Sequence, residues 1–190
     1  MKTNRLEAFS DGVIAVIITI MVLELKPPHE STVAAILAVL PSFVIYGLSF
    51  LVVSIMWINH HHLMHSAKRA DVGLLWANNN LLFWMSLIPF VTGYLGQHFR
   101  DSIAVAAYGA IMTMAGLGFL ILEWVLATQH AHSELQILPF CKRRLKATIA
   151  SLLYASTVGF AFLHIEISYG IFLLIPAAYF WPDKRLYELN

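Results

Sequence analysis

The sequence predicts an all-α membrane protein with six transmembrane helices in each chain. Of its 190 residues, 59% are hydrophobic and only 12% are charged, and the mean hydropathy is +0.72. In a soluble domain about a quarter of the residues are charged. Long uncharged intervals recur along the chain, and about 20 apolar residues in a helix cross a bilayer. Lysine and arginine gather in alternate connections, which is typical of a membrane protein with one orientation.

The six expected helices follow the uncharged intervals. The first ends before Pro27 and Pro28, the second continues beyond the bilayer through a histidine cluster, and the third contains Pro89, which we expect to kink it. No repeat divides the chain into related halves, so we expect one domain over residues 1–190 and find no support for an inverted-repeat transporter. The expected helices are residues 5–25, 33–64, 72–97, 102–128, 145–164 and 167–181.

Topology follows from the positive charges. Ten of the twelve Lys and Arg lie in the N-terminus, the second-to-third connection, the fourth-to-fifth connection and the C-terminal tail. The alternate connections hold only Lys26 and Arg100. Because cytoplasmic segments collect positive charge, we expect both termini in the cytoplasm. The single cysteine, Cys141, excludes an intrachain disulfide framework.

The first helix carries a carboxylate directly before its apolar run. Asn4 and Glu7 have the spacing of a capping box, so we expect the helix to begin near Asn4 and to contain Asp11. A carboxylate on a spanning helix needs a partner from another helix. Beyond it, one helix face holds Gly12, Val13, Val16, Thr19, Ile20 and Leu23. The opposite face is also apolar, which favours a helix buried in a bundle or touching lipid, so periodicity alone does not identify a pore.

Histidines cluster at the end of the second expected helix. His61 and His65 lie four positions apart, which is a metal-ligand spacing. A membrane di-iron enzyme needs several such pairs, and the chain adds only His130 and His132, so we expect neither a metal enzyme nor a structural metal. We expect instead that one histidine pairs with a carboxylate such as Asp11 or Asp71. Asn79 and Asn80 suit helix packing, whereas Asn78 suggests a more specific role.

These residues carry a family resemblance over the first 96 residues. Arg5, Phe9, Ser10 and Asp11 form an RxxxFSD motif, supported by Trp57 and His61 in the second helix. The third helix adds the remaining positions, Asp71, Leu75, Trp76, Asn78, Pro89 and Phe90. With them the sequence resembles the transmembrane protein 175 family, the endolysosomal and bacterial potassium channels.

The resemblance implies a homotetramer in membrane lipid whose four first helices line a central cation pathway. It implies that Asp11 is a buried anchor, with Ser10, His61, Trp76 and Asn78 as its network partners. It places a hydrophobic constriction at Val16, with Ile20 and Leu23 further along the same face, and potassium ions near Thr19. The family commonly has Ile or Leu at the constriction, so Ile20 or Leu23 remain alternatives to the smaller Val16.

The function implied by the resemblance is a potassium-preferring cation channel in the bacterial inner membrane. Its selectivity should be modest, because the sequence contains no TVGYG-like loop to supply a filter of backbone carbonyls. Permeating potassium ions are the only ligands expected, with no cofactor, no nucleic acid and no enzymatic reaction. The alternative is an ion-coupled secondary transporter that uses Glu123, an acid inside the fourth expected helix.

Overall fold

The chain folds into a bundle of long helices. The computed structural model describes residues 3–129 and 137–180, and these residues form seven α-helices. Their bounds are α1 Thr3–Leu23, α2 Val33–His65, α3 Val72–Ser86, α4 Ile88–Gln97, α5 Ser102–Gln129, α6 Ile137–Leu163 and α7 Ile165–Phe180.

Five stretches within these helices are long and apolar enough to cross a membrane. They comprise α1, α2, the combined Val72–Gln97 stretch of α3 and α4, α5, and the Arg144–Leu163 part of α6. Ile165–Tyr179 of α7 is a shorter apolar helix. Because α3 and α4 together make one span, the predicted all-α membrane architecture of six helices is confirmed for the described residues.

The third expected helix is divided rather than kinked. α3 ends at Ser86, Leu87 separates it from α4, and Pro89 is the second residue of α4. Proline lacks the backbone N–H and its ring clashes with the carbonyl four residues earlier, so it bends or breaks a helix that it interrupts. Pro89 instead takes a place in the first turn of a helix, where its fixed φ fits.

Two predicted helix starts differ from the observed ones. α6 begins at Ile137 rather than at residue 145, so Pro139 and the basic cluster that follows lie within the helix. Proline is tolerated there because it stands in the first turn. α1 begins at Thr3, which places Asn4 inside the helix rather than at its cap.

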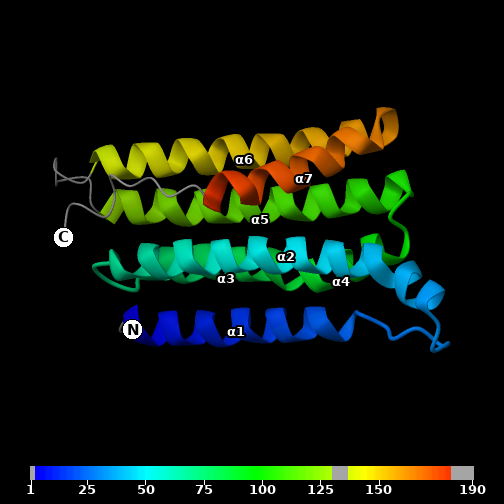
Figure 1. Cartoon of the computed structure of the whole chain (residues 1–190). Helices are drawn as coiled ribbons and strands as arrows, with labels where there is room; N and C mark the ends of the chain where they lie inside the picture. The colour runs from blue at the N-terminus through cyan, green and yellow to red at the C-terminus, as the bar shows by residue number, and fades with distance from the viewer. Residues whose placement is uncertain (1–2, 130–136, 181–190) are drawn as a thin grey trace.

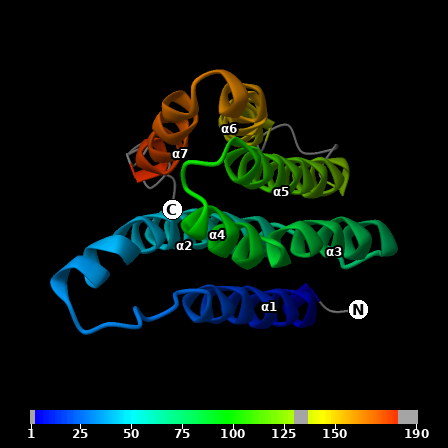
Figure 2. The same ribbon diagram turned by 90° about the vertical axis from the view of Figure 1, so that its right-hand side faces the viewer.

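The helices form layers with α1 on the outside (Figures 1 and 2). α1 packs against α2, α3 and α4; on the other side of this layer lie α5, which packs against α3 and α4, and α7, which packs against α2, and α6 covers both (Figure 2). α1 and α2 run in opposite directions along the bundle (Figure 1). One side of α1 therefore faces away from the rest of its own chain.

Glycine allows α5 and α6 to approach closely. A Cβ added at Gly109 would overlap the hydroxyl of Thr157 on α6, and one at Gly116 would overlap the hydroxyl of Ser151. Small residues at such positions let helix backbones approach, which strengthens packing where lipid supplies no hydrophobic driving force.

Gly109→Ala should therefore lower the melting temperature of the purified protein. Overpacking typically costs about 1–3 kcal/mol. Gly159→Ala is the matched control, because a Cβ there meets no atom within 4 Å in the described part of the chain. Equal melting temperatures for the two variants, measured in the same detergent, would contradict a tight α5–α6 contact at Gly109.

Candidate pore helix and its polar anchors

The two sides of α1 have different surroundings. One side packs inside the chain through Leu6, Ser10, Ile14, Ile17 and Met21, which recur every three or four residues. This spacing keeps them on one line along the helix, so α1 is attached to the bundle through a single continuous face.

All four predicted pore residues lie on the other side of α1. Val16 is 54% exposed and Leu23 is 76% exposed, and Thr19 and Ile20 are exposed with them. The Thr19 hydroxyl donates to the carbonyl of Val16 at 2.9 Å. That bond uses the hydroxyl proton, so the oxygen lone pairs of Thr19 remain available to a cation. Between Gly12 and Leu23 the exposed face is apolar except for this one hydroxyl.

A buried polar cluster joins α1 to α2 and α3. Asn78 Nδ2 donates to Ser10 Oγ at 3.0 Å, and Asn78 Oδ1 lies 2.8 Å from His60 Nε2. Ser10 Oγ also donates to the carbonyl of Leu6 at 2.9 Å. All three side chains, Ser10, His60 and Asn78, are fully buried. Asn78 thus connects the three helices through one amide group.

The histidine of this cluster is not the expected one. The resemblance implies His61 as a partner, whereas the structure places His60 against Asn78. Neighbouring helix positions differ by about 100° in direction, so only one of the two can face the interior. The buried residues Val53, Leu63 and Met64 share the α2 face with His60, and that apolar periodicity was the available signal.

Asp11 has a different partner from those expected. Trp57 Nε1 donates to Asp11 Oδ1 at 2.9 Å, from the facing part of α2. Asp11 is half-buried in the chain rather than buried, and Trp76 is 71% exposed. Arg5 and Phe9 of the motif are also exposed. The structure therefore separates the expected network into the Ser10–Asn78–His60 cluster and the Asp11–Trp57 pair.

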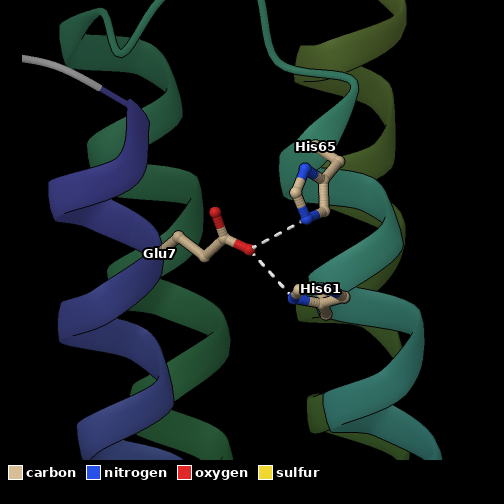
Figure 3. Close-up of side chains that lie close together, drawn as sticks. All are labelled: Glu7, His61 and His65. Atoms are coloured by element: carbon tan, nitrogen blue, oxygen red, sulfur yellow. Dashed lines mark ion pairs between the residues drawn. The ribbon is translucent and has the colours of Figure 1, made fainter.

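The histidines at the end of α2 pair with Glu7 instead of Asp11 or Asp71. Glu7 Oε1 lies 2.9 Å from His61 Nδ1 and 3.6 Å from His65 Nε2 (Figure 3). Both rings point from α2 toward the carboxylate on α1 (Figure 3). His130 and His132 lie outside the described residues.

Asp71 caps α3 and does not contact α1. Its carboxylate accepts the backbone N–H of Leu74 at 2.9 Å, and its other oxygen meets Gln129 at 3.2 Å and Arg69 at 3.4 Å. The Leu74 N–H, followed by the Arg69 guanidinium and the Gln129 amide, holds the pKa of the Asp71 carboxyl below its usual value. Asp71 therefore fixes the α2–α3 connection to the end of α5.

Glu123 is buried in the last part of α5. In Figure 2, α5 lies on the opposite side of the α2–α3–α4 layer from α1. The acid invoked by the transporter alternative is therefore separate from the exposed face of α1.

The chain is similar in sequence and in fold to potassium channels. It is 40% identical over 187 residues to a potassium channel of Chryseobacterium sp. (strain P1-3). This alignment covers 98% of this chain and 96% of that protein. A potassium channel of Streptomyces collinus (strain DSM 40733 / Tue 365) is 34% identical over 171 residues, covering 85% of this chain and 83% of that protein.

A solved structure has the same fold. It is the crystal structure of a lysosomal potassium-selective channel TMEM175 homolog from Chamaesiphon minutus, with a TM-score of 0.83 and 26% sequence identity. The similarity covers 93% of this chain and 95% of that one.

The family model described as the endosomal/lysosomal potassium channel TMEM175 matches residues 5–89. That range contains the exposed face of α1 and both of its polar anchors. The family resemblance predicted from the sequence is confirmed, and so is the prediction that the protein is an ion channel rather than an enzyme. The chain belongs to the TMEM175 family of potassium channels.

Proposed function

We propose that four copies of this chain form a potassium-preferring channel whose central pathway is lined by α1. The observation that carries the proposal is the exposed face of α1, where Val16, Thr19, Ile20 and Leu23 follow one another along the helix. One helix face cannot enclose a pathway for ions. Several copies of α1 around an axis can, and this arrangement would cover the face that the single chain leaves open.

The four residues suit a hydrophobic gate with one polar ring. Val16 and Leu23 are seven residues apart, which is about 10 Å along a helix. Rings of Val16, Ile20 and Leu23 would exclude ions by dewetting a narrow passage, so conduction would require the passage to widen. Four Thr19 hydroxyls between them would offer oxygen ligands to potassium. A single such ring predicts modest selectivity.

The polar contacts on the packed side of α1 would hold it in place around the axis. Ser10 is bonded to Asn78, and Asp11 accepts the Trp57 indole N–H, so both anchors lie before the pore residues on α1. The anchored end is the one that the positive charges assign to the cytoplasm. We propose the bacterial inner membrane, with both termini cytoplasmic, as the setting.

Reversal potentials test the function directly. Purified protein is placed in planar bilayers with potassium on one side and sodium on the other. It should give a steady current whose reversal potential is shifted from zero toward the equilibrium potential of potassium. Saturating uptake into liposomes that needs a coupling ion, without any current, would contradict the channel. Loss of that uptake in Glu123→Gln would then support a transporter.

Thr19→Val should reduce the permeability ratio of potassium to sodium while the protein remains a tetramer. Valine has a similar shape but removes the oxygen ligand. Thr128→Val is the matched control, because Thr128 is also exposed and its hydroxyl donates three residues back, to Val125 at 2.6 Å. The ratio is measured from reversal potentials. An unchanged ratio in Thr19→Val would remove Thr19 from the ion pathway.

A further inference from the structure

Glu7, His61 and His65 bring three metal-binding groups together across two helices. The carboxylate comes from α1, and the two imidazoles come from successive turns of α2 (Figure 3). One donor atom from each residue lies within 4.8 Å of the other two. The sequence showed only the histidine pair, because Glu7 is more than fifty positions away along the chain.

The register between α1 and α2 explains the convergence. The helices run in opposite directions, so Glu7 faces His61 where Asp11, one turn further along α1, faces Trp57, one turn earlier on α2. His65 follows His61 on the same side of α2, and the two rings meet edge to face at 4.5 Å between centroids. The triad is thus the last step of a polar seam between the two helices.

The distances suit a small tetrahedral ion. Zinc bonds to histidine nitrogen and carboxylate oxygen at about 2.0–2.2 Å, which places neighbouring donors about 3.3 Å apart. The two distances from Glu7 Oε1, 2.9 Å and 3.6 Å, lie on either side of that value. The two imidazoles have room to rotate toward it, because His61 and His65 are 42% and 64% exposed.

The chemistry of the donors selects the kind of metal. Two imidazoles and one carboxylate are a common zinc set, whereas magnesium and calcium prefer oxygen ligands throughout. Solvent reaches the site through the exposed histidines, while Glu7 is 16% exposed and fixed against α2. Three protein ligands leave a fourth position for water.

We propose that Glu7, His61 and His65 form a zinc-binding site that bridges α1 to α2. Bound zinc replaces the contact between the Glu7 carboxylate and the histidines by three bonds to one ion. It therefore ties the first turns of α1 to the last turns of α2, and it stabilises the folded protein because the unfolded chain does not hold the ligands together.

Zinc binding to the full-length protein in detergent, freed of any histidine tag, tests the site. Isothermal titration with Zn²⁺ against a competing chelator should show one tight site per chain, and Mg²⁺ should not occupy it. Glu7→Gln and His65→Gln should each weaken that site at least about tenfold. His29→Gln is the control, because His29 is exposed in the α1–α2 connection, far along the chain from the triad. It should bind zinc as the parent protein does.

Thermal melting gives a second readout. Zinc should raise the melting temperature of the parent protein and of His29→Gln, and should not raise that of His65→Gln. His65 is largely exposed, so its variant is expected to fold even if Glu7→Gln does not. Parent-like zinc affinity in His65→Gln, or loss of the tight site only in His29→Gln, would overturn the proposal. Neither readout measures current, so a failure to bind zinc would leave the channel proposal standing. Likewise, the absence of a potassium current would not contradict the zinc site.

Discussion

Asn78→Leu should lower the melting temperature of the protein more than any other single change in the α1 anchors. The substitution nearly preserves the shape of the side chain but removes the amide that connects Ser10 to His60. Ser10 keeps its bond to the carbonyl of Leu6, whereas the Nε2 of buried His60 loses its partner. An unsatisfied buried group costs about 1–3 kcal/mol.

Asn79→Leu is the matched control for this prediction. Asn79 is the next residue of α3 and is exposed, so its replacement removes no buried hydrogen bond within the described residues. The double variant Asn78→Leu with His60→Leu should recover part of the loss, because replacing both partners by apolar groups leaves no orphaned nitrogen. Equal melting temperatures for Asn78→Leu and Asn79→Leu would show that the cluster does not hold α1. So would a double variant whose melting temperature is no higher than that of Asn78→Leu.

The spans could be predicted from the sequence because a bilayer sets a simple physical requirement. A stretch without charge and of sufficient length must be a helix in lipid, since every backbone polar group has to be paired internally. The division of the third span at Leu87 was harder to predict from the sequence. Pro89 was visible in the sequence, but whether a helix bends or divides there depends on the packing of both halves against their neighbours.

The partners within the site depend on how helices face one another, and hydropathy carries little of that information here. The uncharged runs of α1 and α2 are apolar on nearly all sides, so hydropathy there does not mark their inward faces. The choice of His60 over His61 against Asn78, and of Trp57 against Asp11, follows from the register between helices. Glu7 could not be assigned to His61 and His65 before α1 was placed against α2.

Val16→Asn should increase the potassium current of reconstituted protein several-fold. The proposed gate excludes ions because its rings are apolar and the passage dewets when it is narrow. In a tetramer the substitution places four amide groups in one ring, which lets water and ions remain there. Each 1.4 kcal/mol removed from the barrier to permeation raises the rate about tenfold.

The same substitution along α1 locates the narrowest ring. Ile20→Asn and Leu23→Asn test the two alternatives, and Val22→Asn is the control on another side of the same helix. Currents are compared at equal amounts of protein that elutes as a tetramer. The ring whose change raises the current most is the constriction, and we expect Val16. If Val22→Asn raises the current as much as the three pore-face variants, the exposed face of α1 does not line the pathway, and the gate must be sought elsewhere in the assembly.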